Sequence, residues 1–176
     1  MLVRTVRDGD WEACLGIDAG YETDIAWQMD EYQQSGERHI TFREIRLPRT
    51  LRIQPMEPDD GHLKSWQRRD SFWVAVEQRE IISYLGLVID QARYQAHIAE
   101  LVVEPNYRRN GVASAMLLRA TEWCLRQRIH QLVLTCPLKA YPAVAFAQHH
   151  RFAFCGFQDA YWPGQEVALF FRQRIR

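Results

Sequence analysis

The most constraining feature of the sequence is a passage from a strand to a helix in the stretch VVEPNYRRNGVASAMLLRA, residues 102–120. An extended apolar run stops at Pro105, two arginines and Gly111 follow, and a helical pattern then begins. A helix start presents amide groups without helical partners and a partial positive charge. Glycine lets the backbone approach an anion without a Cβ in the way. The junction predicts either a phosphate-binding turn or an ordinary surface turn.

Predicted strands and helices lie on both sides of this junction in the sequence. The segments 71–90, 94–105, 130–136, 151–157 and 166–175 read as strands, with turns at 78–80 and 91–93, and 110–128 and 140–150 read as helices. A short strand and a helix capped by Asp8 or Asp10 begin the chain. The order predicts an α/β domain around a mixed sheet.

The region from residue 20 to 70 is less regular. In 21–36, Tyr21, Ile25, Met29 and Tyr32 recur at a helical spacing, so the pattern predicts a helix that ends at Gly36. Pro48 interrupts the β-rich segment 38–55, which predicts an edge strand or an irregular arm. Segment 56–70 reads as a loop or a short helix, because Pro58 and Gly61 interrupt regular secondary structure.

Length and composition exclude several classes of protein. The length of 176 residues suits a single domain, 1–176, and a net charge of zero without a basic tail gives no support for nucleic-acid binding. No run approaches the ~18 apolar residues of a membrane span, and the N-terminus lacks the features of a signal peptide, so a cytoplasmic protein is expected. The four cysteines form no CxxC pair and lie at no metal-ligand spacing from a histidine, which predicts buried free thiols and no metal.

Within the junction, the residues from Arg108 to Ala113 resemble the Q/R-x-x-G-x-G/A signature of GNAT-superfamily N-acetyltransferases. The preceding ELVVEPNY resembles the strand end of that family. The resemblance is best over residues 70–160. It implies an acetyl-CoA-binding core at 71–176 and a variable N-terminal part at 1–70 on the acceptor side. It further implies a mixed, mostly antiparallel sheet, flanked by helices, with a V-shaped split between the strand ending at Val103 and the strand 131–136.

The resemblance also implies a co-substrate, acetyl-CoA, and a set of residues that bind it. Backbone groups of Val102 and Val103 would bind the pantetheine arm, and amides from Arg109 to Ala113 would hold the pyrophosphate. An N–H group near Leu101–Val103 would polarise the acetyl carbonyl, which a deprotonated amine would attack directly. The full set is Leu101, Val102, Val103, Arg108, Arg109, Asn110, Gly111, Val112, Ala113 and Ser114.

A second family motif, N-x-x-A-x-x-[FL]-Y-x-x-x-G-F, is matched only in its apolar positions. Ala140 stands at the Asn position, Ala147 at the Tyr position that usually supplies the acid, and Arg151 at the Gly position. The nearest replacements for the acid are Tyr141, His149 and His150. The alternatives are an exposed helix end for the two histidines and packing against the sheet for Tyr141.

Two residues of the strand 94–105 are candidates for the general base. His97 stands where many family members carry a glutamate, and Glu100 stands where some aminoglycoside-type relatives carry an acid. A structural role for either residue is the alternative. Simple strand alternation predicts His97, Ala99, Leu101 and Val103 on one face, with Ile98, Glu100 and Val102 on the other.

The acceptor is predicted only as a class. Aromatic and acidic side chains in residues 20–70 and 158–171 suit a cationic amine of a small molecule or a peptide, although the aromatics could equally belong to the core. The predicted residues are Tyr21, Trp27, Tyr32, Trp66, Tyr161 and Trp162, with Glu22, Asp24, Asp30 and Glu31. The tail loosely resembles streptothricin-acetyltransferase-like members of the superfamily. A homodimer is compatible with the fold, and a CoA-binding sensor or interaction module without catalysis is the alternative function.

Overall fold

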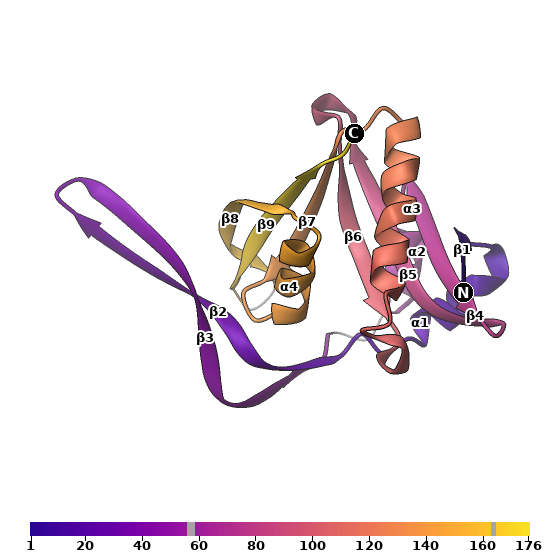
Figure 1. Ribbon diagram of the computed structural model, residues 1–176, viewed down its shortest axis with the longest axis horizontal. Coiled ribbons are helices and arrows are strands. Elements are labelled where there is room, and N and C mark those ends of the chain that lie inside the picture. The colour runs from indigo at the N-terminus through magenta and orange to yellow at the C-terminus, as the bar shows by residue number, and fades with distance from the viewer. Residues whose placement is uncertain (56–58, 163–164) are drawn as a thin grey trace. The chain divides into compact units, whose positions relative to one another are not determined.

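The computed structural model describes residues 1–55, 59–162 and 165–176 (Figure 1). The strands are β1 (Leu2–Thr5), β2 (Tyr21–Gln34), β3 (Glu37–Ile53), β4 (Ser71–Glu77), β5 (Glu80–Asp90), β6 (Gln95–Val103), β7 (Gln131–Pro137), β8 (Ala153–Trp162) and β9 (Glu166–Arg174). The helices are α1 (Trp11–Leu15), α2 (Asp60–Trp66), α3 (Val112–Arg126) and α4 (Tyr141–His149). Pro58, where an interruption of regular structure is predicted, lies outside the described residues.

A seven-stranded sheet in the order β1-β4-β5-β6-β7-β9-β8 carries most of the strands, and β2 and β3 form a separate two-stranded sheet. The pairs β1–β4, β4–β5 and β5–β6 are antiparallel, whereas β6 and β7 are parallel. The β6–β7 ladder joins only Gln95–Ile98 to Gln131–Leu134. The mixed, mostly antiparallel sheet with flanking helices is therefore confirmed, and the ladder stops where a split between these strands is expected.

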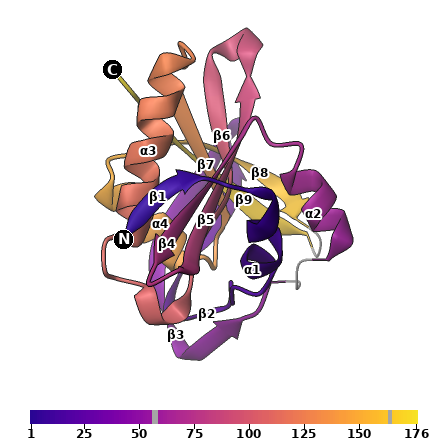
Figure 2. The ribbon, with the colours of Figure 1, turned by 90° about the vertical axis from the view of Figure 1, so that its right-hand side faces the viewer.

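The chain divides into two compact units by its internal contacts. The first contains residues 1–20, 54–134 and 172–176, and the second contains 21–53 and 135–171. In the first unit, α3 packs against β5 and β6 on one face of the sheet, and α1 and α2 lie on the other face (Figure 2). The prediction of a single domain remains a prediction.

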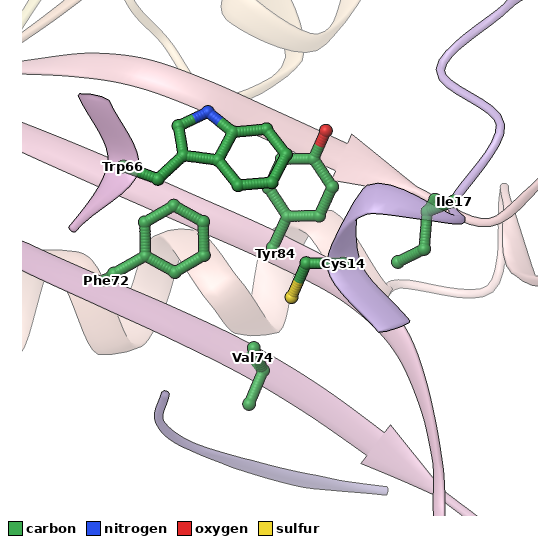
Figure 3. Close-up of a cluster of buried hydrophobic side chains, with 6 residues drawn as sticks. All are labelled: Cys14, Ile17, Trp66, Phe72, Val74 and Tyr84. Carbon is green, nitrogen blue, oxygen red and sulfur yellow. The ribbon is translucent and has the colours of Figure 1, made fainter. Parts of the chain in front are cut away.

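An aromatic cluster fills the space beneath α1 and α2. Trp66 of α2 packs against Tyr84 and Phe72, with ring centroids 4.9 Å and 5.7 Å apart, and Phe72 stacks on Tyr84 at 5.8 Å (Figure 3). Cys14, Ile17 and Val74 complete this buried cluster. Because Trp66 is core, it is unavailable for the acceptor role that its residue type suggested.

The predicted helix over 21–36 is wrong. These residues form β2, which pairs with β3 as a long antiparallel hairpin through a turn at Ser35 and Gly36, both with left-handed backbone (φ 52° and 85°). A spacing of four residues fits a strand face as well as a helix face, because alternate strand residues share a side. Within the second unit, Trp27 and Phe42 pack together with Phe154, Phe157 and Phe171.

Three of the four thiols are buried as predicted, and burial raises the pKa of Cys14, Cys124 and Cys136 to about 12 in each case. The fourth, Cys155, lies exposed on β8, so the prediction of a buried thiol is wrong there. β8 is the last strand of its sheet, and its consecutive residues Ala153, Phe154 and Cys155 are all exposed.

Replacing Phe72 with alanine should lower the free energy of unfolding by about 3–5 kcal/mol, because it leaves a cavity between Trp66 and Tyr84. Phe72 is 5% exposed, whereas Phe154 is 44% exposed. The control Phe154→Ala should cost about 1 kcal/mol or less. Chemical denaturation of both variants measures the difference, and equal losses would contradict the assignment of the core.

Candidate functional site

Beyond Ile98, strand β6 has an edge that does not pair with β7. The Glu104 amide donates a hydrogen bond to Ile82 O at 2.9 Å, so Glu104 directs its backbone groups at β5. In an antiparallel ladder the direction of the backbone groups alternates from residue to residue. Val102 therefore also faces β5, where its carbonyl accepts a bond from the Ser83 hydroxyl at 2.7 Å. Leu101 and Val103 direct their backbone groups toward the open edge.

The loop after β6 leads directly into α3. Arg109 and Gly111 both have left-handed backbone, with φ of 64° and 79°. Gly111 is the N-cap residue of α3, and no side chain caps the helix there. The first helical hydrogen bond is donated by Ala115 to Gly111 O at 3.0 Å, so the amides of Val112 and Ala113 precede the helical ladder. This exposed helix start suits an anion such as a phosphate group.

Arg108 has a different position from that expected of a phosphate ligand. Its guanidinium donates to three backbone carbonyls: Nε to Val103 O at 2.8 Å, Nη1 to Gly20 O at 2.6 Å and Nη2 to Asp18 O at 2.7 Å. The side chain thus joins the end of β6 to the segment that follows α1. Its donors are directed at protein carbonyls, so any part that Arg108 plays in binding a phosphate falls to its backbone or its net charge.

A β-bulge at Ala99 changes the predicted faces of β6. Glu100 pairs with Gly86 and Ile98 pairs with Leu87, so Ala99 is an extra residue between two consecutive residues of β5. The alternation is reversed across the bulge, and His97 pairs with Val88 on the same face as Gly86. The prediction that His97 and Glu100 lie on opposite faces is therefore wrong, because the structure brings them to one face.

Glu100 is held by Arg69, which follows α2. Arg69 Nε lies 3.1 Å and 3.0 Å from the two carboxylate oxygens, and Nη2 donates a further short hydrogen bond to Oε1. The pair is largely buried, with 22% of the Arg69 side chain and 16% of the Glu100 side chain exposed. Gly86 makes this possible, because a Cβ at that position would overlap the carboxylate and press on the Phe72 ring. Such a charge-assisted, bidentate contact fixes the orientation of the carboxylate.

His97 is half-buried and contacts Gln95, whose Nε2 lies 3.0 Å from His97 Nε2. Burial lowers the pKa of His97, with a smaller lowering from Arg93 and an opposing effect from Asp90. The imidazole is therefore neutral at pH 7 and able to accept a proton.

The residues of the second family motif belong to the second unit. Ala147 is fully buried in α4, so the position of the usual tyrosine is closed by packing. Arg151 has a left-handed backbone (φ 59°), which explains why the family motif has glycine there. Loss of hydration raises the pKa of Tyr141, and the nearby carboxylates of Glu44 and Asp24 add to that effect.

The carboxylates that the sequence pattern offered to a cationic acceptor are mostly paired across the β2–β3 hairpin. Asp24, Asp30 and Glu31 form ion pairs with Arg46, Arg43 and Arg38, respectively. These pairs are exposed and contribute little to stability. They do reduce the net negative charge that the hairpin offers to an amine.

Sequence reasoning missed Arg69 and Ser83, which are separated by 31 and 19 residues from their partners on β6. Gly86 was the available signal, since glycine inside a strand often marks the close approach of another group. Among residues 1–55, 59–162 and 165–176, no group of three or more metal-ligating side chains comes together. In the same ranges, none of the helices has the length and apolar character needed to cross a membrane.

Comparisons with known proteins identify the family of the chain. The family model described as the Acetyltransferase (GNAT) family matches residues 39–154, more than half of the chain. The streptothricin acetyltransferase of Streptomyces lavendulae is 21% identical over 168 residues, which cover 92% of this chain and 86% of that protein.

Solved structures share the fold over almost the whole chain. A nourseothricin acetyltransferase has a TM-score of 0.85 with 20% identity, covering 99% of this chain and 98% of its own. A Bacillus anthracis protein in complex with acetyl coenzyme A has a TM-score of 0.78 with 17% identity, covering 99% of both chains. The ribosomal-protein-S18-alanine N-acetyltransferase of Escherichia coli has a TM-score of 0.71 with 14% identity, covering 99% of this chain and 93% of its own. With the family model spanning both β6 and the start of α3, the chain belongs to the GNAT family of acetyltransferases.

Proposed function

We propose that the protein transfers the acetyl group of acetyl-CoA to a primary amine of a small molecule or peptide by direct attack. One observation carries this proposal: the open edge of β6 at Leu101 and Val103 is followed, within one short loop, by the uncapped start of α3 at Gly111. The first feature suits an extended amide-containing chain and the second suits a pyrophosphate, and both occur in coenzyme A.

In the proposed complex, the pantetheine amides add to β6 like a further strand. Leu101 offers an N–H and a carbonyl at the open edge, and Val103 offers its N–H, since its carbonyl already accepts a bond from Arg108. The backbone of Val102 faces β5, so its contribution would come through its side chain. Amides from Arg109 to Ala113 hold the pyrophosphate, and Ser114, Asn110 and the charge of Arg109 complete the predicted set.

The chemical step uses few protein groups. The amine nitrogen attacks the acetyl carbon, and the oxyanion that forms is stabilised by an N–H group such as that of Leu101. The C–S bond then breaks and the thiolate of CoA leaves. The attacking nitrogen gives up a proton to become the amide nitrogen, and the thiolate takes up a proton, so the charges balance. Tyr141 remains the candidate donor of that proton, and the thiolate can also be protonated by water.

The substrate must first lose its ammonium proton to a base. His97 is the better candidate, because burial keeps it neutral at pH 7. Glu100 remains the second candidate, although both of its carboxylate oxygens are already bonded to Arg69.

The relatives support two acceptor classes. One is named for streptothricin, and another is named for the alanine of a ribosomal protein. The higher structural similarity to the nourseothricin acetyltransferase favours a small-molecule amine for this chain. A second candidate function, a CoA-binding module without catalysis, is favoured by the buried Ala147 at the position of the usual acid.

Release of the CoA thiol in the presence of different amines tests the enzymatic function. A panel containing streptothricin, simple diamines and peptides with an N-terminal alanine should contain an amine that accelerates thiol release above the rate of hydrolysis. Mass spectrometry should then detect the acetylated amine. If no amine accelerates release while CoA still raises the melting temperature, the protein is a CoA-binding module.

Replacing Gly111 with aspartate should abolish the thermal stabilisation by CoA, because it adds bulk and negative charge where the pyrophosphate binds. The control Gly111→Ala adds a Cβ that meets no atom within 4 Å, so its cost is the left-handed φ, about 1 kcal/mol of unfolding free energy. Thermal shift with and without CoA measures both variants. A CoA shift in Gly111→Asp as large as in the wild type would refute this placement of the pyrophosphate.

His97 should make the stability of the protein pH-dependent. Its pKa is lowered on folding, so between that value and the ordinary 6.5 the unfolded chain binds more protons. Stability is therefore lost as the pH falls below 6.5. The decrease in melting temperature from pH 7 to pH 5 should be smaller in His97→Gln than in the wild type or in the exposed-site control His149→Gln. An equal decrease in all three proteins would show that His97 is not buried in its neutral form.

A further inference from the structure

Arg108 forms a connection in the first unit that the proposed reaction does not by itself require. Its guanidinium binds the carbonyls of Val103, Gly20 and Asp18 at 2.6–2.8 Å. Val103 lies at the open edge of β6, and Arg108 lies in the loop that joins β6 to Gly111. The same side chain thus contacts the proposed pantetheine edge and, through the chain, the proposed pyrophosphate loop.

The other end of the connection is the root of the β2–β3 hairpin. Asp18 and Gly20 immediately precede β2, and Gln54 immediately follows β3. The Asp18 carboxylate accepts a bond from the Gly20 amide at 2.7 Å and one from Gln54 Nε2 at 3.1 Å. Arg108 therefore holds Asp18 and Gly20, where the chain leaves the first unit. The Asp18 carboxylate in turn holds Gln54, where the chain returns to that unit.

The geometry of the guanidinium makes this contact specific. Arginine presents several donors in a rigid planar fork, so three carbonyls from two segments can be held in one fixed arrangement. Lysine has the same charge and a single nitrogen, which cannot reproduce the fork. A carbonyl bound to a guanidinium also gains from the full positive charge of its donor.

We propose that Arg108 is a positioning residue that couples occupancy of the acetyl-CoA site to the order of the hairpin roots, Asp18–Gly20 and Gln54. This inference rests on the proposed function, and it assigns to the Arg108 side chain a role that its charge alone would not fulfil. A pantetheine arm on Val103 and a pyrophosphate on the loop restrict both attachment points of Arg108, so its bonds to Asp18 and Gly20 become more persistent. The roots that lead into the variable acceptor-side part are then ordered when acetyl-CoA is present. A ligand can bias a segment in this way only if it binds the ordered state more tightly.

Hydrogen exchange of backbone amides, followed by mass spectrometry with and without saturating CoA, tests the coupling. In the wild type, CoA should slow exchange of the amides of residues 17–20 and of Gln54 by about fivefold or more. In Arg108→Lys, which keeps the charge, and in Arg108→Gln, CoA at saturation should leave exchange of these amides unchanged. The exposed-site control Arg126→Gln should behave like the wild type.

Calorimetric titration of CoA into the same samples separates this inference from the proposed function. Binding of CoA without slower exchange at the roots overturns the coupling alone, and so does protection that persists in both Arg108 variants. Absence of CoA binding to the wild type overturns the proposed function and the coupling with it. If Arg108→Gln fails to fold, Arg108→Lys and Gln54→Ala decide the question. Gln54→Ala should keep the protection of 17–20 and lose that of the amide of residue 54.

Discussion

The open edge of β6 is the constraint on which the proposed site depends. Its ladder with β7 ends at Ile98, after four residue pairs. Backbone N–H and carbonyl groups at a strand edge are strong hydrogen-bonding groups that remain available to a ligand. Leu101 supplies both groups here and Val103 supplies its N–H, and the uncapped start of α3 at Gly111 follows eight residues after Val103. An edge and a helix start so close together are suited to one long ligand with amides at one end and phosphates at the other.

The face of β6 toward α1 and α2 is organised by a bulge and an ion pair. The extra residue Ala99 brings His97 and Glu100 to the same side, and Arg69 holds Glu100 over Gly86. Removing one partner from such a largely buried pair is costly, since it leaves an uncompensated charge. The pair thus anchors this face of the strand, and the neutral imidazole of His97 lies on the same face.

The sequence predicted the core of the fold well, because its signals there are local. The hairpin 71–90, the strand before Pro105 and the helix after Gly111 each follow from periodicity and turn residues, and the structure confirms them. The prediction of a helix over 21–36 was wrong because Ile25 and Met29 fit a strand face equally well, and only the pairing with β3 decides. The bulge at Ala99 and the pairing of Arg69 with Glu100 depend on contacts between distant segments. No spacing within β6 could reveal them. The bond from Arg108 to Gly20 could not be predicted either, because it also joins distant segments.

The central claim is that coenzyme A binds to the open edge of β6 and to the start of α3. A titration of the isotope-labelled protein with CoA, followed by backbone amide chemical shifts, tests it most directly. The account predicts that the largest shifts occur at Leu101, Val103 and Arg109–Ala113, with a smaller shift at Val102, whose amide faces β5. Binding of CoA that leaves these amides unshifted and perturbs a different part of the chain would contradict it.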